Sequence, residues 1–222
     1  MTVTRLRSAT SPVSTPPTAV QPLSAYLPER SISAPILTDK DRADLAFVAE
    51  HADLVGLSFV NGPADVRQLR EELERLGRRD IGVVLKIETR RGIENLPDIL
   101  LEALRFDACG VMIARGDLAV ECGFERLAAL QDYILALCEA ARLPVVWATQ
   151  VMENLAKRGH PTRAEVTDAA AGQAAECLML NKGPHIVQAL SMLDTIIRDA
   201  ERRRFKGDAL AAPLRLPGFP TD

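Results

Sequence analysis

The chain has 222 residues, of which 47% are hydrophobic and 26% are charged, so it is long enough for one globular domain with a real core. Its formal net charge of −3 excludes a general attraction to nucleic acid, and no apolar run approaches the roughly 20 residues of a membrane span. Its four cysteines lack CxxC spacing, which argues against a disulfide framework or a zinc site and predicts reduced, buried thiols in a cytoplasmic protein. We therefore expect neither nucleic acid nor a membrane as a partner.

The two ends of the chain differ in composition from its middle. Residues 1–34 are rich in Ser, Thr and Pro and show no sustained periodicity, which predicts a flexible arm. A transit peptide is the less favoured explanation of this arginine- and serine-containing start. Residues 207–222 are rich in proline and are expected to form a tail, so the domain is predicted to span residues 35–206.

Between the two ends, helical and extended patterns alternate. The first helix is predicted over residues 39–51, with Thr38 as its N-cap. The further predicted helices cover residues 64–76, 91–104, 124–141, 163–171 and 185–203. The predicted strands cover residues 54–59, 83–85, 109–113, 144–148 and 177–180. Because these strands are continuously apolar, they are typical of a parallel sheet that is buried on both faces.

A strict alternation of helix and strand indicates an α/β fold, either a doubly wound sheet or a (β/α) barrel. The barrel is favoured because polar residues stand at or just beyond the strand C-termini, where a barrel gathers its site. These residues are Ser58, Lys86, Glu88, Asp117, Thr149, Gln150, Asn181 and Lys182. Only about five strands are visible, whereas a closed barrel has about eight. The sequence therefore predicts a partial (β/α)8 TIM-type barrel.

Two clusters carry the candidate chemistry, Lys86-Ile87-Glu88 and Ala114-Arg115-Gly116-Asp117. Lys86 and Glu88 are two residues apart on a strand and so share a face. Asp117 follows the end of the next strand. Two carboxylates and an ammonium at neighbouring strand ends suit a divalent cation and an anionic substrate, while a structural ion pair among solvated charges is the simpler alternative.

These clusters belong to a wider resemblance. Residues 35–203 resemble the second, larger part of the catalytic barrel of the pyruvate kinase family, with the order and spacing of the motifs retained. The matching segments are residues 35–41, 57–60, 86–88, 114–118, 148–150 and 161–165.

The resemblance implies a role for each matching residue. Glu88 and Asp117 would hold Mg²⁺ or Mn²⁺, and Lys86 would offset the charge of the phosphoryl group and the enolate. Backbone amides of Ala114, Arg115 and Gly116 would bind the substrate carboxylate, as N–H groups at a helix start do. Thr149 would lie near the carbon that becomes the methyl group of pyruvate and help to deliver a proton.

The chain also departs from the family. The three earlier strands and lid domain that the family places before this region, and its regulatory domain, are not in this sequence. Those strands and the lid domain carry an arginine and the K⁺ ligands used in substrate binding, so K⁺ is possible by family only. The usual Ser-Gly-Glu-Thr after the fifth strand is replaced by Asn181-Lys182-Gly183-Pro184. Lys182 is therefore a candidate residue for binding a phosphate group through the charge of its ammonium. The alternative is that Lys182 is a solvated loop residue with no part in the site.

The resemblance implies a glycolytic phosphotransferase that moves a phosphoryl group between phosphoenolpyruvate and ADP, giving pyruvate and ATP, and that is weakly active or inactive as this chain alone. The alternatives are a metal-dependent aldolase or lyase acting on pyruvate or its enolate, and a non-catalytic remnant. Because five strands leave two open edges, we also expect self-association or a complementing segment.

Overall fold

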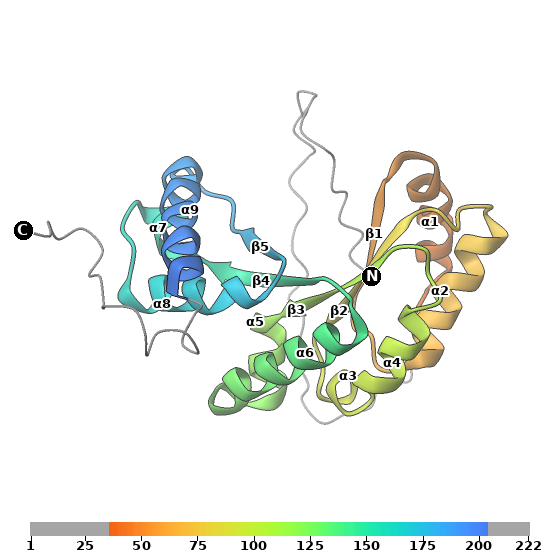
Figure 1. The fold of residues 1–222 in the computed structure, drawn as a ribbon. Helices are drawn as coiled ribbons and strands as arrows, with labels where there is room; N and C mark the ends of the chain where they lie inside the picture. Colours follow the sequence, from red (N-terminus) through yellow and green to blue (C-terminus); the bar gives the residue numbers. More distant parts are fainter. Residues whose placement is uncertain (1–35, 204–222) are drawn as a thin grey trace, which may run out of the picture.

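The computed structural model describes residues 36–203, and Figure 1 shows them as a coloured ribbon. The expected arm (1–34) and tail (207–222) lie outside the described residues. Among residues 36–203, no helix is both long enough and apolar enough to cross a bilayer.

One sheet of five parallel strands forms the centre of the molecule, and each strand pairs with the next one in the chain. The strands are β1 (Leu54–Leu57), β2 (Gly82–Ile87), β3 (Cys109–Ala114), β4 (Val145–Val151) and β5 (Cys177–Leu180). Helices follow the strands, as in successive β/α units of a barrel. The predicted fold class, a partial barrel of five parallel strands with alternating helices, is confirmed.

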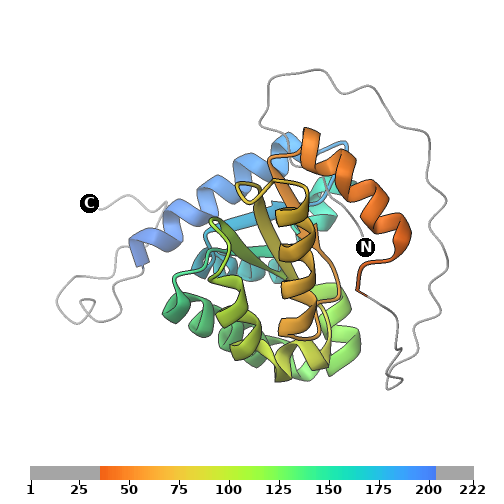
Figure 2. The same cartoon turned by 90° about the vertical axis from the view of Figure 1, so that its right-hand side faces the viewer.

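The described helices pack against one face of this sheet. They are α1 (Asp39–His51), α2 (Pro63–Arg75), α3 (Arg90–Glu94), α4 (Leu96–Ala103), α5 (Arg115–Cys122), α6 (Leu127–Ala141), α7 (Glu153–Arg158), α8 (Arg163–Ala171) and α9 (Ile186–Arg203). Figure 1 shows α2, α4 and α6 beside the first three strands and α7, α8 and α9 around β4 and β5. Figure 2 views the molecule from the side of α1 and α2, with α9 extending away as a long helix.

The two faces of the sheet differ in burial. The side chains of one face are at most 2% exposed and pack into the hydrophobic core with the helices. They are Val55, Leu57, Val83, Leu85, Ile87, Val111, Ile113, Val145 and Trp147. On the other face, Val84, Met112 and Val146 are only partly buried within residues 36–203. The apolar strands predicted burial on both faces, but the described helices cover only one, and the other is the face that a closed barrel would enclose.

Several helix boundaries differ from the sequence prediction. The helix predicted over 91–104 is divided at Asn95 into α3 and α4, because Pro97 starts a new helix at its first turn. Asn95 also donates from Nδ2 to the Asn61 carbonyl at 2.7 Å, which ties the break to the loop after β1. The helix predicted over 124–141 begins as α6 at Leu127, after a short 3₁₀ turn. The helices α5 and α7 were not predicted.

The cysteines are free, but their burial differs from the expectation. Cys138 is fully buried and Cys109 and Cys122 are partly buried, whereas Cys177 is exposed at the edge strand β5. The expectation of four buried thiols is therefore wrong for Cys177. Burial raises the pKa of both Cys109 and Cys138 to about 12, because an apolar environment disfavours the thiolate.

Candidate metal and anion site at the strand ends

The candidate site residues come from four neighbouring strands. Ser58 follows β1, Lys86 lies in β2 and Glu88 comes directly after it. The register pairs Lys86 with Met112 of β3, and Ala114 of β3 with Ala148 of β4. Because the carboxyl ends of parallel strands share one edge of the sheet, the start of α5 and Thr149 lie at the same edge as Lys86 and Glu88.

Lys86 and Glu88 form a buried ion pair. Lys86 Nζ lies 2.6 Å from Glu88 Oε1 and donates to Ser58 Oγ at 3.0 Å. The side chain of Glu88 is 1% exposed and that of Lys86 is 20% exposed. The ion pair that the two-residue spacing suggested is therefore real, but Glu88 is withdrawn from solvent and not part of a solvated charge cluster.

The second oxygen of Glu88 is bound by the backbone. Phe59 N–H donates to Glu88 Oε2 at 2.8 Å. Phe59 has φ +55°, a left-handed conformation that a bulky residue adopts only where the surroundings hold it there. The turn after β1 is thus bent so that its N–H points at the carboxylate.

Thr149 occupies an irregular part of β4. Thr149 and Gln150 have φ +63° and +56°, and the pairing of β4 with β5 shifts register between Trp147 and Val151. Thr149 Oγ1 accepts a hydrogen bond from Gly116 N–H at 2.9 Å. The bulge therefore aims the threonine hydroxyl at the first turn of α5.

The side chain of Arg115 supports this bulge from within the protein. It is 6% exposed, and its Nε donates to the Ala148 carbonyl at 2.8 Å while its terminal nitrogens bind the Thr149 carbonyl and the Asp168 carboxylate. The guanidinium carbon lies 4.7 Å from the centre of the Trp147 ring, a cation–π arrangement. The side chain of Arg115 is thus fully engaged within the protein, and the role of its backbone amide in binding an anion stays a prediction from the resemblance.

Asp168 and Trp147 were not singled out from the sequence. Asp168 is three residues beyond Glu165, in the helix α8 that follows the matching segment 161–165. No local pattern shows that it reaches Arg115, 53 positions away in the chain. Trp147 is the only tryptophan of the chain and directly precedes the matching segment 148–150. This position is the one feature of the sequence that draws attention to it.

Asp117 and Lys182 are more exposed than the other candidates. Asp117 lies in the first turn of α5, where the helix dipole stabilises a carboxylate. Lys182 is exposed in the loop between β5 and α9. For neither side chain do residues 36–203 provide a hydrogen bond or ion pair, so the structure does not bring Lys182 into contact with Lys86 or Thr149.

The donor set fits a magnesium-type cation. Glu88 and Asp117 offer hard carboxylate oxygens, and Asp117 is accessible. Within residues 36–203 no three His, Cys, Asp or Glu side chains form a cluster that would hold a metal alone. Two protein carboxylates are consistent with Mg²⁺, which usually keeps several positions for water and substrate oxygens.

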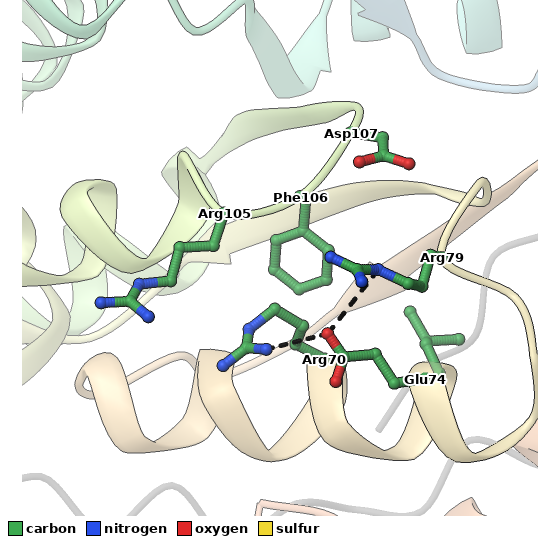
Figure 3. A pocket seen from close by; sticks show the side chains of 7 residues that line it. Arg70, Glu74, Arg79, Arg105, Phe106 and Asp107 are labelled. Atoms are coloured by element: carbon green, nitrogen blue, oxygen red, sulfur yellow. Dashed lines mark hydrogen bonds and ion pairs between the residues drawn. The ribbon is translucent and has the colours of Figure 1, made fainter.

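A small depression at the other end of the sheet carries a different kind of charge cluster. Figure 3 shows it between α2 and the turn before β3, with Phe106 among the lining side chains. Glu74 lies 2.9 Å from Arg70 and 3.8 Å from Arg79, while Arg105 pairs with Glu102 outside the depression. We interpret this depression as a structural ion-pair network.

Comparison with known proteins shows what the chain as a whole is similar to. The family model described as the barrel domain of pyruvate kinase matches residues 22–196. A pyruvate kinase of Dictyostelium discoideum is 35% identical over 185 residues, which cover 80% of this chain and 35% of that protein.

Two further relatives have similar coverage. A pyruvate kinase of Mycobacterium intracellulare is 41% identical over 145 residues, 65% of this chain and 29% of that protein. Pyruvate kinase PKLR of Rattus norvegicus is 35% identical over 200 residues, 85% of this chain and 34% of that protein. The chain spans about a third of the length of these curated relatives, and it belongs to the pyruvate kinase family.

Proposed function

We propose that the strand-end site supports phosphoryl transfer between phosphoenolpyruvate and ADP with a divalent metal. The observation that carries this proposal is the buried pair of Lys86 and Glu88, which lies at the same edge of the sheet as Thr149 and the start of α5. Phosphoryl transfer depends on positioning and on neutralisation of charge, and this edge offers an ammonium, two carboxylates and helix N–H groups.

Glu88 and Asp117 are the proposed metal ligands. The bound cation would neutralise charge on the phosphoryl and enolate oxygens. Lys86 would donate hydrogen bonds to the phosphoryl group during its transfer and would stabilise the enolate that the transfer produces. Both roles place positive charge where negative charge develops in the transition state.

Thr149 is the proposed proton donor to the enolate carbon. Its oxygen already accepts the Gly116 N–H, so its own O–H proton remains free to point elsewhere. Backbone amides of residues 114–116 would hold the substrate carboxylate at the N-terminus of α5. The Gly116 amide would then serve both Thr149 and the substrate.

The scope of the proposal follows from the length of the match. Because the chain spans about a third of its relatives, turnover by this chain is proposed to be very low or absent without further segments that exclude water and clamp the substrate. Lys182 remains a proposed phosphate-binding residue, and K⁺ a possible second cofactor by family alone. ADP and phosphoenolpyruvate are the proposed partners in a cytoplasmic setting.

The metal assignment is tested by Mn²⁺ binding. Glu88→Gln should weaken Mn²⁺ binding at least about ten-fold, because it removes the buried charged oxygen ligand. The control is Glu94→Gln in α3, whose exposed carboxylate lies 3.0 Å from Arg90 and is not at the strand ends. Equal Mn²⁺ affinities of the two variants would remove Glu88 from the site.

Turnover separates the proposed reaction from its alternatives. In a coupled assay, ADP-dependent pyruvate formation by this chain should be very low or absent, and any formation that the assay does detect should be lost in Lys86→Met. Retro-aldol cleavage of a pyruvate adduct in place of phosphoryl transfer would favour a lyase, which uses the same kind of carboxylate pair. Metal binding without either reaction would identify a non-catalytic module.

A further inference from the structure

We propose that Lys86 and the divalent cation compete for Glu88, so that metal binding releases the lysine toward the open side of the site. This proposal rests on the proposed function, because it takes Glu88 as a metal ligand. It goes further in assigning Lys86 a second role, as the counter-ion of the buried Glu88 carboxylate when no metal is bound.

The burial of Glu88 explains why such a counter-ion is needed. A carboxylate that is 1% exposed is costly unless its charge is paired. Within residues 36–203 its partners are the Phe59 N–H on Oε2 and the Lys86 ammonium on Oε1. Only the ammonium carries a full positive charge, so Lys86 is the group that compensates Glu88 in the absence of metal.

The same geometry makes the two cations repel each other if both bind Glu88. Lys86 Nζ lies 2.6 Å from Oε1, while a bound Mg²⁺ would lie about 2.1 Å from its ligand oxygen. If both bound the same oxygen, the ammonium and the metal would be only about 4 Å apart, and two positive charges at that distance repel strongly in a site withdrawn from water. The other oxygen is held by the fixed backbone of Phe59. Binding of the metal to Oε1 therefore favours displacement of Lys86 from that oxygen.

Lys86 is the partner that is free to move. It is 20% exposed, whereas Ser58 and Glu88 are 2% and 1% exposed. Its four-carbon stem allows the ammonium to swing outward while the strand stays in place. Ser58 Oγ, at 3.0 Å, is a hydrogen-bond acceptor that holds the ammonium beside Glu88. Metal loading and release of the lysine are thus one coupled event.

The test measures Mn²⁺ affinity by calorimetry or by the EPR signal of free Mn²⁺. Lys86→Met and Lys86→Gln should each bind Mn²⁺ about ten-fold more tightly than the unmodified chain, because the competitor is gone. Lys86→Arg keeps the charge and should bind within about two-fold of the unmodified chain. Lys157→Met removes a lysine that pairs with Glu153 on α7, and should leave the affinity unchanged.

The outcomes distinguish this proposal from the proposed function. Unchanged or weaker Mn²⁺ binding in both neutral variants, with Glu88→Gln still impaired, would overturn the competition and leave the metal site in place. Absence of Mn²⁺ binding by every variant would overturn the metal site and the competition together.

A second measurement needs no variant and so does not depend on folding of the mutants. Reductive methylation of the unmodified chain, followed by peptide mass spectrometry, reports how accessible each lysine is. Saturating Mg²⁺ should increase the labelling rate of Lys86 several-fold, while Lys157 serves as the internal control. An unchanged Lys86 rate at a Mg²⁺ concentration that saturates the site would contradict the release of the lysine.

Discussion

At the scale of single residues, the environment of Glu88 shows what spacing alone conveys. The sequence placed Lys86 and Glu88 on one face of a strand, and the structure joins them at 2.6 Å. Spacing does not convey burial, and it does not convey the turn at Phe59 that occupies the second oxygen of Glu88. That turn holds the bulky Phe59 in a left-handed conformation, which no propensity rule anticipates.

Thr149 is the residue whose hydroxyl links two elements. Thr149→Val should lower the free energy of unfolding by about 1–2 kcal/mol, because the Gly116 N–H loses its acceptor. Thr149→Ser keeps the oxygen and removes a methyl group from a left-handed residue, so its stability should equal or exceed that of the unmodified chain. Urea unfolding measures both.

The control for Thr149 is Thr167→Val in α8. The Thr167 hydroxyl bonds only to carbonyls of its own helix and is exposed, so its loss should change stability by less than about 0.5 kcal/mol. Equal stabilities of the Thr149→Val and Thr149→Ser variants would show that the bond to Gly116 contributes nothing.

The cysteines should differ in reactivity. Burial raises the pKa of Cys109 and Cys138 to about 12, so at pH 8 both are protonated and unreactive. Cys177 is exposed and should be alkylated first by iodoacetamide, with peptide mass spectrometry as the readout. Labelling of Cys138 as fast as Cys177 would mean that the hydrophobic core opens readily in solution.

At the scale of elements, local capping signals determined which helices the sequence predicted well. The observed α1 and α8 begin at the predicted residues, and each has a capping box, Thr38 with Asp41 and Thr162 with Glu165. By contrast, α5 begins at Arg115, and its N-cap residue, Ala114, provides no side-chain hydrogen bond. Its start depends on the contact between Gly116 and Thr149, which are far apart in the chain, so no local pattern reveals it.

Arg115 should be the main support of the bulge in β4. Arg115→Lys cannot reproduce the fork that binds the Ala148 and Thr149 carbonyls and Asp168, so unfolding should become easier by about 3 kcal/mol. Because Trp147 is the only tryptophan, its fluorescence should also change when the guanidinium leaves its ring.

The comparison for Arg115 is Arg163→Lys at the exposed start of α8. That variant should keep both the stability and the emission of Trp147. A shift of stability in Arg115→Lys without any change in fluorescence would place the loss elsewhere than at the Trp147 contact.

At the scale of the whole molecule, the sequence predicted the order, type and number of the strands, because continuous apolar runs and alternation with helices are strong signals. It also predicted that Lys86, Glu88, Thr149 and the start of α5 share one edge. It did not predict the half-buried second face, because a strand sequence does not tell what lies opposite each face.

That second face leads to a prediction about association. Val84, Met112 and Val146 are only partly buried, and β1 and β5 have unpaired edges within residues 36–203. We expect the 222-residue chain to self-associate as its concentration rises, or to bind a complementing segment, because association would bury this apolar surface. Sedimentation velocity over a range of concentrations measures this. A single monomeric boundary at all concentrations, with sharply cooperative and high thermal stability, would contradict it.

The order of the strands also bears on how the chain folds. Every strand pair in this sheet joins neighbours in the sequence, so none has to close a loop over the full length of the chain. A closed barrel must bring its first and last strands together, which adds long-range contacts and slows folding. The described part can instead grow unit by unit from its N-terminal side, so that β1 and β2 with α2 are able to pair during synthesis, before β5 has left the ribosome.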